Sequence, residues 1–331
     1  MRYYDIQVTD PDTGKKLDDF CFSSVLNGVF NPNCLMVEFD IQKYGMSTPA
    51  GECLVRVYGL DQKSMMQANQ NLPGKTISVS VGMMPGLPLA TAAYNEKQYG
   101  LVLEGTIWQA YGNWQGINLS LDMIIRYGPV ASSSNPTGPM NVTLPWKKGQ
   151  KLSVALTQCF QVGFPSYTPV INISDNLILS YDSPMFCGTL ESLSSYLNSM
   201  SKSIIRQPDY SGVEIAVVGK EIKAWDNLGN PVKQNKIKKI NFNDLNGQPN
   251  WIRPQTVMLT MVMRADINVG DDIKMPKEAV QTVINLPGSL PNYRNKSAFA
   301  GVFRVTSVRI IGNSRIPDAS GWTTVIEAIT T

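Results

Sequence analysis

The chain of 331 residues contains no histidine. Histidine is the most common general base, the usual partner of a catalytic serine and the most common metal ligand. Paired carboxylates can still hydrolyse glycosides without it. Asp271 and Asp272 are adjacent acids, but neighbouring side chains of a strand point to opposite faces of a sheet. We therefore predict that Gly270, Asp271 and Asp272 form a turn that enters a strand, and not a catalytic pair.

The segment Gly74-Lys75-Thr76 is similar to the end of a phosphate-binding P-loop. A P-loop needs a glycine where Asn69 stands, and it must lead into a helix, whereas the strand-like residues 77–81 follow here. The chain also has no G-x-S-x-G turn that would present a nucleophilic serine. We predict that the protein is not an enzyme, with no catalytic residues, no cofactor-binding residues and no metal ligands.

The cysteines and the termini give no sign of export or of a bound group. The cysteine count is odd and no C-x-x-C spacing occurs, so neither a zinc site nor a disulfide framework is indicated. The N-terminus lacks the apolar run of a signal peptide, and no apolar stretch reaches the roughly 20 residues that cross a bilayer. We expect a protein made in a reducing cytoplasm, with no cofactor and no membrane span. The cysteines are Cys21, Cys34, Cys53, Cys159 and Cys187.

The lack of histidine also predicts a flat pH profile. No remaining side chain has an unperturbed pKa between about pH 5 and 8. We therefore expect the free energy of unfolding to vary little over that range.

Tryptophans and lysines are the remaining candidates for binding. The six tryptophans could form a platform for a sugar, but they are scattered along the chain, which favours core and interface anchors. They are Trp108, Trp114, Trp146, Trp225, Trp251 and Trp322. Basic residues gather at Lys233, Lys236, Lys238 and Lys239. Lysines of this kind protect a solvated strand edge from pairing; the alternative is contact with an acidic partner, and the role of this cluster is left open.

The elements that position these residues begin with a predicted C-terminal hairpin. Val302–Ile311 and Trp322–Ile329 are rich in β-branched residues and flank a loop with several turn-forming residues. A final strand that covers a sheet edge is typical of sandwiches and barrels. Alternation divides the first run into two predicted faces: Val302, Val308 and Ile310 on one, and Phe303 and Val305 on the other.

A comparable hairpin is predicted over residues 100–126. Its loop is predicted at Gly112–Gly116, where two glycines can supply the positive φ angles that a hairpin requires. Shorter strands are predicted before each hairpin, over residues 35–41, 54–58, 76–81, 256–264 and 272–275. The chain therefore has two β-units of similar build, although no repeat of residues is visible.

Between these β-units the hydrophobic period changes from two to about 3.6 residues. Helices are predicted over residues 151–162 and 189–205, the second capped by Thr189, and a short helix over 61–71 in the first β-unit. Residues 131–139 (ASSSNPTGP) are predicted to be a linker or long loop.

Further strands are predicted beside the two central helices, over residues 170–180, 213–218 and 220–225. The predicted fold is mainly β with a small α+β insert. Residues 1–128 form the first β-unit, residues 129–225 the linker and insert, and residues 226–331 the second β-unit.

Three parts of the sequence resemble the central hub proteins of contractile-tail phage baseplates, and the N-terminal hub part of the related secretion-system spike proteins. The similarity lies in pattern and covers most of the chain. Against that family, the three parts are similar to early strands of the first barrel, its closing hairpin and the final strands of the second barrel. They are residues 37–43 (VEFDIQK) with 54–60 (LVRVYGL), 101–111 (LVLEGTIWQAY) with 117–125 (INLSLDMII), and 302–315 (VFRVTSVRIIGNSR) with 321–328 (GWTTVIEA).

The resemblance implies two tail-tube-like β-barrel or sandwich units in one chain, and a homotrimer in which three chains form a ring with pseudo-sixfold symmetry. Such a ring joins the tail tube to the central spike and surrounds a channel through which DNA passes without specific binding. The implied partners are a tail-tube or tube-initiator protein and the central spike protein, with the tape-measure protein as a further candidate. The implied location is the tail baseplate of the virion, assembled in the host cytoplasm.

Two other functions stay open at this point. A single-type tail-tube or distal-tail protein has about half this length and forms true hexamers. A carbohydrate- or receptor-binding β-protein of the virion would gather tryptophan or tyrosine side chains on one exposed face.

Overall fold

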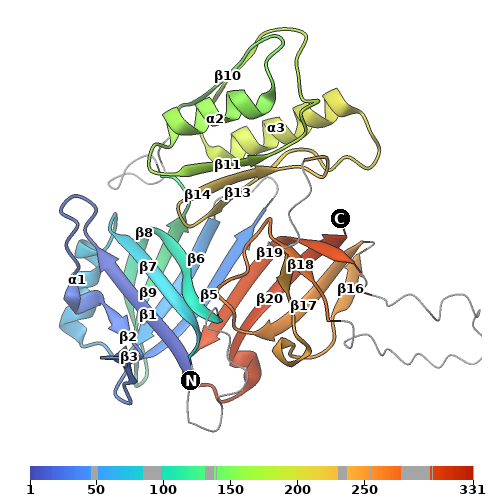
Figure 1. The fold of residues 1–331 in the computed structure, drawn as a ribbon. Helices are drawn as coiled ribbons and strands as arrows, with labels where there is room; N and C mark the ends of the chain where they lie inside the picture. Colours follow the sequence, from blue (N-terminus) through green and yellow to red (C-terminus); the bar gives the residue numbers. More distant parts are fainter. Residues whose placement is uncertain are drawn as a thin grey trace, which may run out of the picture.

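The computed structural model describes residues 1–45, 51–84, 98–130, 138, 140–229, 237–253, 255–276, 299 and 301–330. In these residues the protein is mainly β, with one large, curled and largely antiparallel sheet of 13 strands. A small α+β insert stands against one end of this sheet (Figure 1). The fold class predicted from the sequence, mainly β with a small helical part, is confirmed.

The N-terminal part of the sheet has the strand order β5-β6-β9-β8-β7-β1-β2. Its strands alternate between buried apolar and outer polar side chains, which is typical of a sheet with one covered face. Helix α1 (Gln62–Asn71) packs on β8, and the Asp61 carboxylate caps it by accepting a hydrogen bond from the Ser64 amide. The strands are β1 (Arg2–Thr9), β2 (Phe22–Ser23), β5 (Met36–Tyr44), β6 (Gly51–Tyr58), β7 (Thr76–Met83), β8 (Tyr99–Gln115) and β9 (Asn118–Tyr127), with a separate hairpin of β3 (Val25–Leu26) and β4 (Val29–Phe30).

The C-terminal part of the sheet has the order β16-β17-β20-β19, with β18 on β19 and β15 on β18. Residues 307–313 of β19 pair with residues 38–44 of β5, so both parts belong to one sheet and share one hydrophobic core. The strands are β15 (Lys238–Lys239), β16 (Asn250–Arg253), β17 (Thr256–Val262), β18 (Asp272–Lys274), β19 (Val302–Asn313) and β20 (Trp322–Thr330).

The same arrangement of five consecutive strands occurs twice in this sheet. Strands β5 to β9 lie in the order β5-β6-β9-β8-β7, and strands β16 to β20 lie in the order β16-β17-β20-β19-β18, with every neighbouring pair antiparallel. The fourth strand of each set has a bulge against the fifth, at Trp108 in β8 and at Thr306 in β19. The two β-units therefore have one topology in common.

The insert has its own hydrophobic core. Two helices, α2 (Leu152–Gly163) and α3 (Leu190–Ile205), cover a three-stranded sheet of order β11-β14-β13, whose strands lie between the helices and the large sheet (Figure 1). Thr189 caps α3, as predicted, by accepting a hydrogen bond from the Ser192 amide. The strands are β10 (Val142–Trp146), β11 (Thr168–Asn172), β12 (Ser183–Cys187), β13 (Glu214–Val218) and β14 (Glu221–Trp225).

The C-terminal hairpin exists as predicted, but the predicted faces of its first strand are wrong. Phe303, Val305, Val308 and Ile310 are all buried. The extra residue of the bulge at Thr306 shifts the side-chain alternation by one position, so apolar residues on both sides of it point into the core.

Three further predictions need correction or lie outside the described residues. The hairpin loop predicted at Gly112–Gly116 is shorter, because β8 continues to Gln115 and only a tight turn at Gly116, with φ +63°, precedes β9. The strand predicted over residues 170–180 ends at Asn172. The linker predicted over residues 131–139 lies, except for Gly138, outside the described residues.

Candidate functional site

The outer faces of β5, β6 and β9 carry a cross-strand network of charges. Arg56 of β6 donates two hydrogen bonds, both 2.7 Å long, to the carboxylate of Asp122 on β9, and its Nη1 lies 3.5 Å from Glu38 on β5. Asn113 and Ser120 also donate to Asp122, so this nearly buried carboxylate accepts four hydrogen bonds. The bonds to Asp122 raise the pKa of Arg56 above its usual range, which keeps the pair charged.

A second ion pair crosses the junction between the two parts of the sheet. Arg309 of β19 donates to both oxygens of Asp40 on β5, at 2.9 and 2.6 Å. These hydrogen bonds lower the pKa of Asp40 and raise that of Arg309. Both side chains are partly exposed, so the pair contributes at most about 1 kcal/mol to stability. Its geometry is bidentate, which favours one register of β19 on β5.

A third pair completes this outer face. Arg126 of β9 donates to Glu52 of β6 at 2.7 Å and lies over the ring of Trp108, 4.6 Å from its centroid. The whole network contains three arginines and four carboxylates, a net charge of −1, and no lysine. Each of these guanidinium groups is bound to a carboxylate. Among the described residues of β5, β6, β9 and β19, this face is therefore polar and nearly neutral, without an unpaired cation that would hold a polyanion.

Asp271 and Asp272 lie where the sequence predicts a turn. Gly270 has a φ of +81°, and β18 begins at Asp272. The Asp271 carboxylate lies 2.7 Å from the Lys238 ammonium, whereas Asp272 forms a bidentate pair with Arg304 at 2.9 and 3.2 Å. The two carboxylates bind different cations, and the prediction of a turn entering a strand is confirmed.

The structure describes half of the lysine cluster. Lys238 is paired with Asp271, and Lys239 is exposed beside it on β15. Lys233 and Lys236 lie outside the described residues. Lys238 is thus bound to a carboxylate of the same chain. Of the two described lysines of this cluster, Lys239 is the exposed one.

The structure does not gather the tryptophans on one exposed face. Trp146, Trp225 and Trp322 are buried, while Trp114 is 70% exposed and Trp251 is 44% exposed. The two exposed rings lie on β8 and β16, in different halves of the sheet. No aromatic platform for a sugar forms from them.

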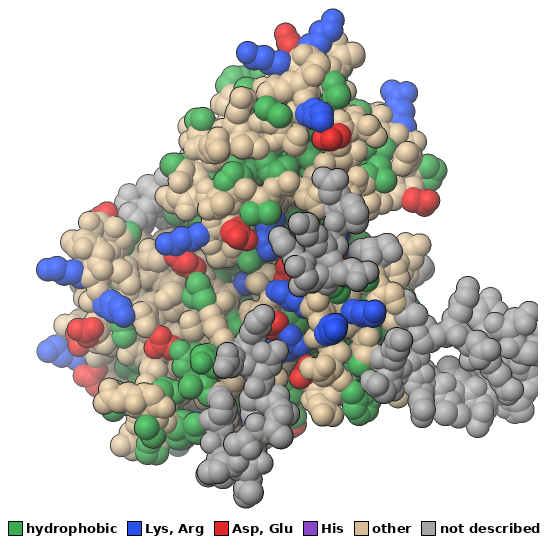
Figure 2. Space-filling model, viewed as in Figure 1, with side chains coloured by type: hydrophobic (Ala, Val, Ile, Leu, Met, Phe, Trp, Pro, Cys, Tyr) green, Lys and Arg blue, Asp and Glu red, His purple; other side chains and the backbone are tan. Residues whose placement is uncertain are grey.

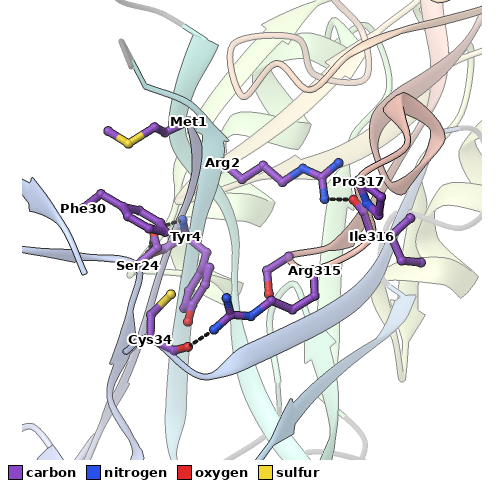
Figure 3. A pocket seen from close by; sticks show the side chains of 10 residues that line it. Met1, Arg2, Tyr4, Ser24, Phe30, Cys34, Arg315, Ile316 and Pro317 are labelled. Atoms are coloured by element: carbon purple, nitrogen blue, oxygen red, sulfur yellow. Dashed lines mark hydrogen bonds between the residues drawn. The ribbon is translucent and has the colours of Figure 1, made fainter. Parts of the chain in front are cut away.

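A groove of about 370 Å³ lies at the end of the large sheet that is away from the insert (Figure 3). The guanidinium of Arg2 donates to the backbone oxygens of Asn313 and Asp318, and that of Arg315 donates to the oxygen of Cys34. Both arginines therefore fasten the loop after β19 to the N-terminal part of the chain. Sequence analysis missed this groove because three distant segments form its walls.

Exposed apolar side chains adjoin the groove at the β3–β4 hairpin. Leu26 is 64% exposed, Val29 69% and Phe30 38%. Figure 2 shows apolar side chains gathered at this end of the molecule. The groove and these exposed side chains of the hairpin adjoin one another.

Within the described ranges, no cluster of three or more potential ligands is arranged to bind a metal ion. No helix in the described part of the chain is both long and apolar enough to cross a membrane.

No protein-family model and no curated protein sequence matches the chain. The structure is similar to that of the 43 kDa tail protein of prophage MuSo2 from Shewanella oneidensis, with a TM-score of 0.52, 7% identity and coverage of 100% of this chain and 98% of that chain. The two chains share a fold. The tail protein from Neisseria meningitidis MC58 gives a TM-score of 0.49 at 10% identity, over 98% of this chain and 96% of that chain. At 7% identity the likeness to the MuSo2 tail protein concerns the fold, and it extends over the full length.

Proposed function

We propose that this protein is a non-enzymatic structural hub of a phage tail baseplate. The observation that carries the proposal is the repeated set of five strands, β5–β9 and β16–β20, joined edge to edge within one chain. The full-length likeness in fold to a tail protein of a Mu-like prophage supports a role in a phage tail.

The repeat leads to a trimer by counting. Closed rings are built by repeating one interface at every step. Three chains with two units each present six similar units, which match a sixfold tail tube on one side and keep threefold symmetry for a central spike on the other. The partner on the tube side of the ring is the tail-tube protein or a tube-initiator protein. The tape-measure protein is a further candidate partner. Two units per chain also separate this hub from a single-type tail-tube or distal-tail protein, which offers one.

We assign the outer charge network of β5, β6 and β9 to the wall of the channel. Unpaired lysines or arginines in a channel would bind phosphate groups and release counterions, which would slow the passage of DNA. Arg56, Arg126 and Arg309 are each bound to a carboxylate, and the network has a net charge of −1. This wall therefore fits DNA that passes without specific binding.

Labelling in assembled particles tests the proposal. Antibodies against this protein should decorate the distal end of the tail in purified particles seen by electron microscopy, and particles made without the protein should lack a joined tube and spike. Label on the capsid or on peripheral fibres, or normal tails without the protein, would contradict the role as a hub.

A further inference from the structure

Two strand edges of the repeated units have no partner in the described part of the chain. Residues 109–115 of β8 pair with β9 on one side, while β7 pairs with β8 only up to Thr106. Strand β16 pairs with β17 on one side, and no other described strand pairs with it. The unpaired stretch of β8, QAYGNWQ, contains no charged residue and no proline. Natural proteins normally protect such an edge with charges, prolines or a covering element. Helix α1 packs on β8 where Met65 meets Gly112, but the backbone edge of residues 109–115 has no second strand partner among the described residues.

The second β-unit shows what pairs with such an edge, because its equivalent stretch, in β19, is paired with another strand of the same chain. Residues 307–313 of β19 follow the bulge at Thr306 as residues 109–115 of β8 follow the bulge at Trp108. This part of β19 binds β5, the first strand of the other unit, over seven residue pairs. Since β16 is the first strand of its own unit, it occupies the place of β5.

We infer that residues 109–115 of β8 in one copy pair antiparallel with β16 of a second copy, and so repeat between chains the β19–β5 junction that each chain contains. This inference rests on the proposed ring and specifies its contact between copies. The occupant is a second copy of this chain, since the pair of strands to be matched is the same in both junctions.

The register follows from the pairings within each unit. Gln109 opposes Ile124, which opposes Leu54, and Leu54 opposes Asp40. The same path in the second unit runs from Ser307 through Glu327 and Met258 to Asn250. Asn250 therefore corresponds to Asp40, and Gln109 to Ser307.

In the junction within the chain, Ile311 opposes Asp40. The corresponding pair between copies is Asn113 with Asn250. Asn113 is half-buried and Asn250 is exposed in the single chain.

Side-chain chemistry at the two edges agrees with this pairing. Tyr111 is 39% exposed and Trp114 70% exposed on β8, and Trp251 is 44% exposed and Ile252 39% exposed on β16. Large apolar and aromatic residues are enriched at the centres of protein interfaces. In the inferred register, no two residues of like charge lie opposite each other across the β8–β16 pair.

Engineered disulfides test the register directly. Residues directly opposite in antiparallel strands have Cβ atoms about 4.5–5.5 Å apart, and their Cα spacing lies within the range that a disulfide spans. The double variant Asn113→Cys with Asn250→Cys should form covalent dimers and trimers on a non-reducing gel after mild oxidation of the full chain, and the bands should disappear on reduction.

Two matched pairs serve as controls. Ile311→Cys with Asp40→Cys occupies the equivalent positions within the chain, so it should form a disulfide in a monomer-sized band. Asn113→Cys with Trp251→Cys places the second thiol on the opposite face of β16, and it should give no covalent oligomer.

Monomer-sized protein from the Asn113→Cys, Asn250→Cys pair, under conditions in which the internal pair is oxidised, would overturn the inferred pairing. Equal cross-linking of the Trp251→Cys control would overturn the register. Either result is compatible with the proposed function if antibodies against the protein still decorate the tail end. Absence of the protein from tails would instead contradict the role as a hub.

Discussion

The burial of Lys43 in the core of the large sheet can be tested through its effect on the free energy of unfolding. On β5 the core-facing positions are Val37, Phe39, Ile41 and Lys43, and the lysine is only 7% exposed. Burial, as the main cause, lowers the pKa of Lys43 to about 8, and the nearby ammonium of Lys223 lowers it further. Asp271 acts in the opposite direction.

The shift has a defined sign and size. The ordinary value is 10.5, so between about pH 8 and 10.5 the unfolded chain holds a proton that the folded chain has lost. Stability therefore rises with pH across this window, and below pH 8 the folded protein bears the whole penalty of a buried charge. At about 1.4 kcal/mol per pKa unit, this penalty is about 3 kcal/mol.

Replacing the ammonium should therefore stabilise the protein. Lys43→Met keeps an unbranched side chain without the charge. We expect its free energy of unfolding at pH 7 to exceed that of the natural chain by up to about 3 kcal/mol, with the difference falling between pH 8 and 10.5. Urea unfolding at a series of pH values measures this difference. Groups common to both chains cancel in the comparison.

An exposed lysine provides the control. Lys63 lies on the solvent-facing side of α1, so Lys63→Met should change neither stability nor its pH dependence. A Lys43→Met variant that is less stable than the natural chain at pH 7, or whose difference does not change between pH 7 and 11, would refute the assignment of Lys43 to the core.

Three further predictions concern other parts of the chain. Burial raises the pKa of Glu214 to about 7 from 4.5, so stability should fall as pH rises from about 4.5 to 7, by up to about 3 kcal/mol, and Glu214→Gln should remove this slope in urea titrations. Trp322 is 3% exposed, donates a hydrogen bond to the Gly82 oxygen at 2.9 Å and packs edge-to-face on Phe39. Trp322→Ala should therefore lower the free energy of unfolding by about 3–5 kcal/mol, measured in thermal or urea unfolding. Deletion of residues 320–331 should cause aggregation or exclusion from particles. Asp122→Asn should cost about 2 kcal/mol, because Arg56 loses its carboxylate; an unchanged urea midpoint would mean that water replaces this pair at no cost.

The sequence predicted most strands of the large sheet because buried and outer residues alternate along them, but it missed the short strands β2, β15 and β16. It predicted α1 and α3 because Asp61 and Thr189 are effective N-caps. It missed β10 and β12 because each contains a proline, Pro145 and Pro184, which lie opposite each other in the paired strands. Proline within a run normally argues against a strand, and only an edge pairing of this kind accommodates it.

Other features depend on contacts that local sequence does not encode. Pairing of β5 with β19 joins residues more than 260 positions apart, so the repeated topology and its junction became visible only in the folded chain. The raised pKa of Glu214 arises from burial and argues against the flat pH profile expected from the lack of histidine, and urea titrations decide between the two predictions. The cross-strand arginine pairs likewise follow from register, which periodicity alone does not determine.

The central claim is a ring of three chains that presents six similar β-units around a channel. Electron microscopy of purified particles, with averaging of the tail end, measures the number of copies directly. We predict three copies per ring, each contributing two units, with Lys238 and Lys239 away from the narrowest part of the channel. Six copies, a single copy, or these lysines lining the constriction would contradict the account.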